Sequence, residues 1–167
     1  MKPPIILREA AREDERRFLA LARASRTLHH PWIAAPATSA QFGAYLQRTD
    51  GDANHAFLVC RRGDGDIAGV INLTNIVLGA FRSGYLGYYV FAGNERQGFM
   101  REGLRAMVRH AFQSLRLHRL EANIQPGNAA SIALAKSCGF SLEGYSPRYL
   151  KIRGRWRDHE RWAIRAS

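Results

Sequence analysis

The chain has 167 residues, of which 46% are hydrophobic, so it is long and apolar enough for a folded domain and is not an intrinsically disordered protein. Lysine and arginine outnumber aspartate and glutamate by 25 to 14. The formal net charge of +11 favours acidic partners such as nucleic acid or phosphorylated cofactors, unless it reflects only an arginine-rich composition. No apolar run approaches the roughly 20 residues that cross a membrane, and the N-terminus has neither the apolar core nor the cleavage site of a signal peptide. We therefore expect one domain over residues 1–167, located in the cytoplasm, with Cys60 and Cys138 as reduced thiols.

Hydrophobic periodicity divides the chain into strands and helices. The first half predicts a strand at Ile5–Arg8, a helix at Ala11–Ser25, a helix capped by Ser39 and running to about Arg48, and strands at Ala56–Arg61 and Ile67–Val77. The segment Thr27–Ile33 interrupts the helical pattern, because Pro31 prevents its continuation. The second half predicts a strand at Ser83–Phe91, a helix from Gly98 to about Leu115, a strand at Leu120–Ile124, a short helix capped by Asn128 and ended by Cys138-Gly139-Phe140, and strands around Tyr149–Ile152 and Asp158–Ile164.

One part of this order joins two strands through a long helix. The stretch from Ser83 to Ile124 forms a β-α-β unit, whose strands should be parallel and whose crossover should be right-handed. The other strands favour antiparallel pairing. We therefore predict an α/β fold with a mixed, mostly antiparallel sheet, one β-α-β crossover, and helices on both faces.

The stretch from Leu86 to Met100 is an apolar strand, a short polar loop and a glycine that opens a helix. Free backbone N–H groups and the positive end of the helix dipole should meet there, and Gly98 lets the backbone approach an anion closely. Arg96 and Arg101 flank the same place, so the pattern favours a pyrophosphate. The loop is neither a Walker motif nor a dinucleotide fingerprint. A tight strand-to-helix connection without a ligand would also use this glycine.

The same loop resembles a known family. Residues Glu95-Arg96-Gln97-Gly98-Phe99-Met100 are similar to the coenzyme A pyrophosphate loop of the GNAT acyltransferase superfamily, usually written Gln/Arg-x-x-Gly-x-Gly/Ala. Glu95 replaces the usual Gln or Arg, and Met100 replaces the small residue, as is familiar in the RimJ/RimL branch. That branch's Asn-x-x-Ser…Gly-Phe…Glu-Gly signature resembles Asn128…Ser131, Gly139-Phe140 and Glu143-Gly144, and similarity to its alanine N-acetyltransferases extends over Ile67–Asn75, Tyr85–Tyr88 and Gly154–His159.

The resemblance implies a GNAT-type fold, acetyl-CoA as co-substrate and no metal; the sequence itself has no His/Cys/Asp/Glu cluster with metal spacing. The pantetheine arm would enter a gap between the strand at Tyr88, Tyr89 and Val90 and the strand at Leu120–Ile124, with Val90 as its pairing residue. Backbone N–H groups would hold the pyrophosphate at Arg96, Gln97, Gly98, Phe99 and Met100. Asn128 would contact the coenzyme near its pantetheine portion, and a strand N–H would polarise the acyl carbonyl.

The resemblance also implies direct attack of an amine on the thioester. The tyrosine that many GNAT enzymes use as a general acid falls at Ala135, and the glutamate that some relatives use as a base falls at Leu150, so both roles are vacant. Ser131 matches the serine proposed for the acid role in RimL-like enzymes; alternatively, its hydroxyl bonds to its own helix backbone. A water chain is the alternative base. A free α-amine, with a pKa of about 7.7–8.0, is partly neutral at cell pH and needs little base assistance.

The sequence says less about the acceptor amine and where it binds. Trp32, in a loop with His29 and His30, and Asn75 are candidate acceptor contacts; alternatively, Trp32 anchors the loop and Asn75 makes a strand-end hydrogen bond. We expect the acceptor to be the N-terminal alanine α-amine of a ribosomal or other protein, which is compatible with association with the ribosome. A small amine such as an antibiotic or an amino acid, and a non-catalytic coenzyme A or RNA-binding module, are the alternatives. The sequence leaves monomer or homodimer open.

Overall fold

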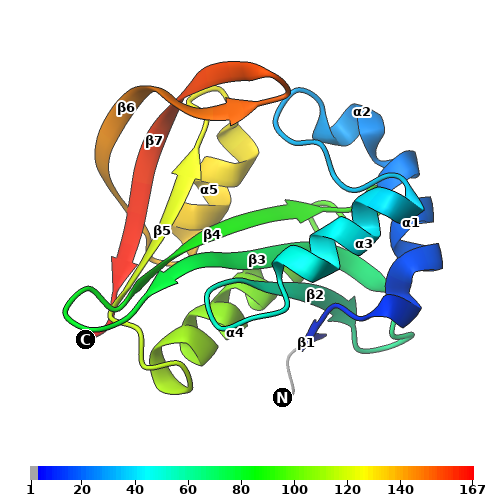
Figure 1. Ribbon diagram of the computed structural model, residues 1–167, viewed down its shortest axis with the longest axis horizontal. Coiled ribbons are helices and arrows are strands. Elements are labelled where there is room, and N and C mark those ends of the chain that lie inside the picture. The colour runs from blue at the N-terminus through cyan, green and yellow to red at the C-terminus, as the bar shows by residue number, and fades with distance from the viewer. Residues whose placement is uncertain (1–3) are drawn as a thin grey trace.

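The computed structural model describes residues 4–167, in which seven strands form one sheet with the order β1-β2-β3-β4-β5-β7-β6 (Figure 1). The strands are β1 (Ile5–Glu9), β2 (His55–Arg61), β3 (Ile67–Val77), β4 (Ser83–Val90), β5 (Arg119–Ile124), β6 (Ser141–Ile152) and β7 (Arg155–Arg165). β4 and β5 are parallel, and the other neighbouring pairs are antiparallel. The predicted mixed sheet with one β-α-β crossover is confirmed.

Helices cover both faces of this sheet (Figure 1). They are α1 (Glu15–Ala24), α2 (Arg26–His29), α3 (Ser39–Arg48), α4 (Phe99–Gln113) and α5 (Ala129–Ser137), with a 3₁₀ turn at Arg12–Asp14 before α1. Side chains of α1 and α3 belong to a core cluster around Phe18 and Phe42, and those of α4 and α5 belong to a second cluster around Leu104 and Met107. The central strands supply both clusters, because alternate residues along a strand point to opposite faces.

The N-cap of α3 is Thr38, so the prediction of Ser39 was wrong by one residue. Thr38 has an extended backbone, and its side chain accepts a hydrogen bond from the Gln41 N–H at 3.2 Å. This is the geometry that an N-cap requires, and Ser39 is already the first helical residue. The predicted cap Asn128 is confirmed, since its side chain accepts from the Ser131 N–H at 3.3 Å.

Two other segments also differ from the prediction. The interrupting segment before Pro31 is partly helical, since α2 continues to His29 ahead of the cis peptide bond His30–Pro31. The last two strands are longer than predicted and form one long hairpin. Register shifts between Leu142 and Gly144 and between Ser146 and Leu150 break the alternation that strand prediction relies on.

The sheet opens at its centre, where β4 leaves β5. The two strands pair only from Ser83 opposite Arg119 to Leu86 opposite Ala122. Beyond that point β4 continues to Val90 beside β3, while β5 continues beside β7 (Figure 1). The gap therefore lies at the carboxyl ends of the parallel pair, where α/β sheets bind ligands.

Candidate active site

The backbone of β4 beyond Leu86 faces the gap on one side. The N–H of Phe91 donates to the Ala68 carbonyl at 2.8 Å, so the peptide groups of odd-numbered residues in β4 turn toward β3. Alternation along an antiparallel pair then turns the peptide groups of Tyr88 and Val90 toward the gap. This agrees with the splayed strand that the sequence resemblance predicts.

The carbonyl of Val90 is already engaged. It accepts a hydrogen bond from Nε2 of His29 in α2 at 2.8 Å, which leaves the Val90 N–H for a ligand. His29 is buried against the rings of Tyr89 and Phe91, and burial lowers its pKa, so the ring is held as a neutral donor. His29 therefore supports the strand, and it is not an exposed acceptor contact.

Ser25 holds the chain two residues beyond Val90, at Ala92. Its hydroxyl donates to the Leu21 carbonyl at 2.6 Å and accepts from the Ala92 N–H at 2.9 Å, and the residue is fully buried. Ser25 and His29 together form what we call the strand-end clasp. The clasp fixes the point where β4 becomes the loop that leads to α4.

That loop presents a row of unused backbone donors. In the part of the chain that the structure describes, the N–H groups of residues 96–101 have no protein acceptor, and the first α4-directed bond comes from Glu102 to the Gly98 carbonyl at 3.1 Å. Gly98 is the left-handed N-cap of α4, with φ +82, and the nearest atom to an added Cβ would be Nη2 of the flexible Arg101 side chain, at 4.0 Å. A diphosphate fits such a row of donors at a helix start.

Side-chain hydrogen bonds fix the shape of this loop. Asn94 is buried and accepts from Arg61 Nη1 at 2.8 Å, while Gln97 Nε2 donates to the Gly93 carbonyl at 2.7 Å. The Glu95 carboxylate accepts from the Gly93 N–H at 2.6 Å. These contacts use side chains and leave the N–H row free, so the loop shape does not depend on a ligand.

Met100 contributes to this site through its backbone. Its side chain is buried and packs over Gly69 of β3, where a Cβ would collide with the Met100 sulfur and lie 2.7 Å from the Tyr89 carbonyl. The absent side chain at position 69 therefore makes room for a large one at position 100. This explains how a methionine replaces the small residue of the family loop.

The start of α5 faces β4 across the gap. Tyr88 donates its hydroxyl proton to the Ser131 carbonyl at 2.9 Å, and burial raises the pKa of Tyr88 to about 12, so the phenol stays protonated. The Ser131 hydroxyl has no hydrogen-bond partner among residues 4–167, and the side chain is half-buried. Ser131 thus does not bond to its own helix, and its hydroxyl is available to a ligand. Ala135 lies in the core.

The remaining predicted residues lie apart. The Trp32 indole packs against Gly127, and its carbonyl accepts from Gln125 at 3.1 Å, so Trp32 anchors the loop after α2 to the end of β5. Asn75 has φ +52 at an irregularity of β3, beside the paired half of β4, and its N–H donates to Asn54 at 3.0 Å. The structure does not bring Asn75 together with the other candidates.

Tyr89 points away from Tyr88, onto the face covered by α1 and α3. Its hydroxyl is buried without a partner in the described residues, and burial raises its pKa well above 10.0. Of the predicted coenzyme residues, Tyr89 therefore offers neither its side chain nor a gap-facing peptide group. The strand-end clasp and the Tyr88–Ser131 hydrogen bond were not predicted from the sequence, because both join residues that are far apart in it.

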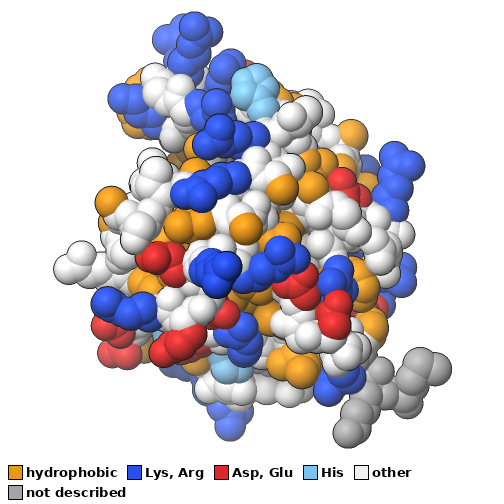
Figure 2. All heavy atoms as spheres, turned by 90° about the vertical axis from the view of Figure 1, so that its right-hand side faces the viewer, with side chains coloured by type: hydrophobic (Ala, Val, Ile, Leu, Met, Phe, Trp, Pro, Cys, Tyr) orange, Lys and Arg blue, Asp and Glu red, His pale blue; other side chains and the backbone are white. Residues whose placement is uncertain are grey.

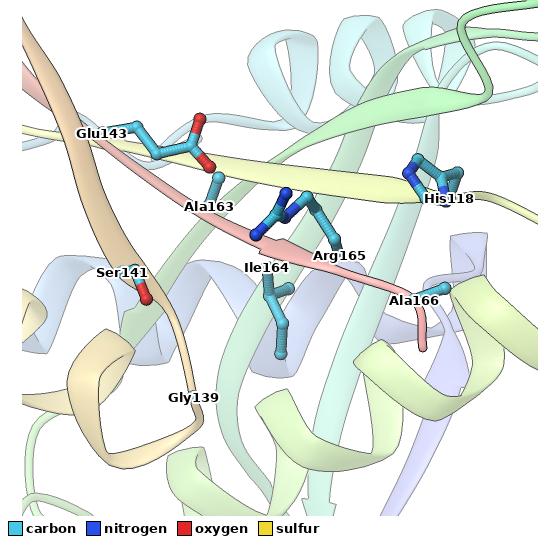
Figure 3. A pocket seen from close by; sticks show the side chains of 8 residues that line it. All are labelled: His118, Gly139, Ser141, Glu143, Ala163, Ile164, Arg165 and Ala166. Carbon is cyan, nitrogen blue, oxygen red and sulfur yellow. The ribbon is translucent and has the colours of Figure 1, made fainter.

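Two hollows lie outside the gap. One, of about 350 Å³, lies where β5 begins and β7 ends, with His118, Glu143 and Arg165 in its lining (Figure 3). The other, of about 610 Å³, lies between α2 and the β6–β7 turn and is lined by Arg26, His30 and Arg153 among others.

Within residues 4–167 no cluster of His, Cys, Asp and Glu could hold a metal ion. No described helix is long and apolar enough to cross a membrane.

Comparison with known proteins agrees with this geometry. Residues 5–141 match the family model described as acetyltransferase (GNAT) domain. The chain is 33% identical over 120 residues to probable N-acetyltransferase YjcK of Bacillus subtilis, and 42% identical over 94 residues to the ribosomal protein uS5-alanine N-acetyltransferase of Escherichia coli. These segments cover 72% and 56% of this chain, and 66% and 48% of the two relatives.

Solved structures share the fold over almost the whole chain. The RimJ protein of Mycobacterium smegmatis in complex with CoA-disulfide superposes with a TM-score of 0.87 at 27% identity, covering 97% of this chain and 82% of that one. A spermidine N-acetyltransferase of Vibrio cholerae, in complex with CoA and spermine, shares the fold with a TM-score of 0.81 at 24% identity, covering 97% and 95%. With its splayed β4, its donor loop and its matching family model, this chain belongs to the GNAT acetyltransferase family.

Proposed function

We propose that this protein transfers the acetyl group of acetyl-CoA to the N-terminal α-amine of a protein acceptor, with an alanine N-terminus of a ribosomal protein as the leading candidate. The observation that carries the proposal is the row of unused N–H groups at residues 96–101, placed where β4 leaves β5. The relative from Escherichia coli, named as an alanine N-acetyltransferase of a ribosomal protein, supports the acceptor.

In this proposal each part of the gap has one task. The N–H groups of residues 96–101 bind the pyrophosphate, the gap-facing peptide groups of Tyr88 and Val90 pair with the pantetheine arm, and Asn128 contacts that arm. Acetyl-CoA supplies the activated thioester. The attacking amine loses a proton as the C–N bond forms and the C–S bond breaks, and the departing sulfur gains one. We infer that the Ser131 hydroxyl passes a proton to the sulfur while it accepts one from the ammonium through water, and its lack of a competing partner within the described chain supports this role.

Charge on the acceptor side favours a protein over a polyamine. Residues 16–49, which include α2 and the loop after it, contain five arginines and no aspartate or glutamate. The turn between β6 and β7 is equally basic, and Arg26 and Arg153 line one hollow. A polycation such as spermidine would be repelled there, although the spermidine acetyltransferase shares the fold.

The test is acetyl-CoA turnover, followed as free thiol, with a peptide that begins with alanine, the same peptide with a blocked N-terminus, and a panel of small amines including spermidine. We expect turnover with the free peptide only. Turnover with small amines alone would replace the proposed acceptor, and tight acetyl-CoA binding without any turnover would support a coenzyme-binding module.

Two pairs of variants test the proposed roles of the donor loop and of Ser131. Gly98→Asp places a carboxylate in the donor row, whereas Gly79→Asp adds the same charge at another left-handed glycine with open space around it, in the β3–β4 loop. Acetyl-CoA binding should be lost in the first variant and kept in the second. Ser131→Ala should lower kcat, whereas Ser137→Ala on the same helix, whose hydroxyl bonds to the Leu134 carbonyl, should not.

A further inference from the structure

Two separate segments of the chain are basic without any acidic residue. Residues 16–49 carry Arg16, Arg17, Arg23, Arg26 and Arg48. Residues 147–157 carry Arg148, Lys151, Arg153, Arg155 and Arg157. The second group lies on the hairpin of β6 and β7, with its turn between Ile152 and Arg155.

The fold brings the two segments together. Arg153 Nη1 donates to the Ile33 carbonyl at 3.5 Å, and Arg26, His30 and Arg153 line the same hollow of about 610 Å³. Figure 1 shows the turn of the hairpin beside the loop that follows α2. Viewed from the right-hand side of Figure 1, basic side chains gather at the top of the molecule, whereas basic and acidic side chains are mixed below (Figure 2).

These cations differ from the arginines of the protein that form ion pairs. Arg17, Arg61 and Arg119 each form ion pairs with carboxylates. By contrast, within residues 4–167 no carboxylate pairs with Arg26, Lys151, Arg153, Arg155 or Arg157. The five cations are exposed and have no internal counter-charge, so a polyanion would meet them without displacing a salt bridge.

An exposed aromatic side chain lies on the same hairpin as these cations. Trp156 is 60% exposed and shares a face of the hairpin with Lys151, its partner in the register, while its sequence neighbours Arg155 and Arg157 alternate to the other face. Phosphates pair with guanidinium groups through two parallel hydrogen bonds, and unpaired bases stack on exposed aromatic rings. We propose that this surface, the basic rim formed by Arg26, Lys151, Arg153, Arg155, Arg157 and Trp156, binds single-stranded RNA.

The chemistry favours RNA over the other polyanions. An acidic protein segment would use the cations, but its carboxylate side chains have no flat ring to stack on the indole, whereas each unpaired base does. An anionic membrane would need several large apolar side chains to insert, and Leu28 and Leu150, which accompany Trp156 near the rim, are only 37% and 38% exposed. The inference does not rest on the proposed acetyl transfer, because the binding is measured without acetyl-CoA or acceptor.

The experiment measures the fluorescence anisotropy of a labelled single-stranded RNA of mixed sequence, titrated with the full chain at several salt concentrations. The triple variant R153Q/R155Q/R157Q should weaken binding and reduce the slope of log K against log salt by about 2, since each lost phosphate contact changes that slope by about 0.7. Trp156→Ala should weaken binding about 5- to 150-fold through lost stacking.

The matched control is R12Q/R48Q/R109Q, which removes the same charge from exposed arginines outside the rim. It should leave the salt slope and affinity close to those of the parent chain. Equal weakening by both triple variants would reduce the effect to net charge and overturn the proposal. So would equal binding of polyglutamate or of phosphatidylserine vesicles, which would assign the rim to an acidic protein or to a membrane.

Discussion

The two halves of β4 are held in different ways. Residues Ser83–Leu86 pair with β3 on one side and β5 on the other, so backbone ladders hold them from both edges. Residues 88–90 keep the β3 ladder, but their other edge is held by side chains: His29 binds the Val90 carbonyl, and the Tyr88 hydroxyl binds the Ser131 carbonyl. The open half is thus fixed without a second neighbouring strand, which keeps its remaining peptide groups free for a ligand.

The largest effect is expected in the paired half. Leu86 is 4% exposed and packs in the cluster under α4, so Leu86→Ala should lower the free energy of unfolding by about 2–5 kcal/mol. Urea unfolding measures this loss. Leu78→Ala, at a residue 57% exposed in the β3–β4 loop, is the control and should change stability by less than about 0.5 kcal/mol. A Leu86→Ala variant of near-parental stability would contradict the difference between the halves.

A smaller effect is expected at the clasp. His29→Phe keeps a ring of similar size but leaves the Val90 carbonyl without its donor, which should cost about 1–3 kcal/mol. The freed carbonyl also loosens the strand end, so the KM for acetyl-CoA should rise more than kcat falls. His30→Phe is the control, because His30 is exposed and makes no side-chain hydrogen bond within residues 4–167. If both variants behave alike, the clasp does not hold the strand.

The two tyrosines offer a closer comparison at the same strand. Tyr88→Phe removes the hydroxyl that binds the Ser131 carbonyl, and it should lower stability by about 0.5–1.5 kcal/mol. Tyr89→Phe removes a buried hydroxyl without a partner in the described chain, so it should be neutral or stabilising. Thermal unfolding of the two variants measures both changes in stability. If Tyr89→Phe is less stable than Tyr88→Phe, the assignment of the two side chains to opposite faces of the sheet is wrong.

The smallest expected effect is a pH dependence. Burial lowers the pKa of His29 and of His159, so the unfolded chain binds protons to these rings more tightly than the folded chain. Their contribution to stability is present above the unfolded pKa of about 6.5 and is lost as the pH falls below it. Urea midpoints at pH 7.5, 6.5 and 5.5 should therefore decline, and His29→Phe should flatten the decline. An unchanged slope in that variant would exclude His29 as a contributor.

Features set by nearby residues were predictable from the sequence. The crossover from Ser83 to Ile124, the glycine that opens α4 and the Asn128 cap each depend on spacing within a few residues or on the order of elements, and all three are confirmed. The prediction of Ser39 as the cap was wrong and Thr38 is the cap, because the two neighbours have similar side chains and only the backbone angles distinguish them.

Contacts between distant segments were not predictable in this way. His29 lies 61 residues before Val90, and Tyr88 lies 43 residues before Ser131. Nothing in the local pattern around His29 shows that the loop after α1 returns to the end of β4, so the sequence suggested an acceptor contact there. The proposed roles of Ser131 and Asn128 remain predictions, and Ser131→Ala tests the first of them.

The packing of Met100 over Gly69 has a consequence for how this chain can change over time. The two positions share one volume across the boundary between α4 and β3, so neither can be replaced freely on its own. A small residue at position 100 would leave a void that position 69 cannot fill, because an added Cβ there would still lie 2.7 Å from the Tyr89 carbonyl oxygen. Position 69 is therefore held as glycine by the backbone of β4 as well as by Met100, and we expect it to stay glycine whichever residue occupies position 100.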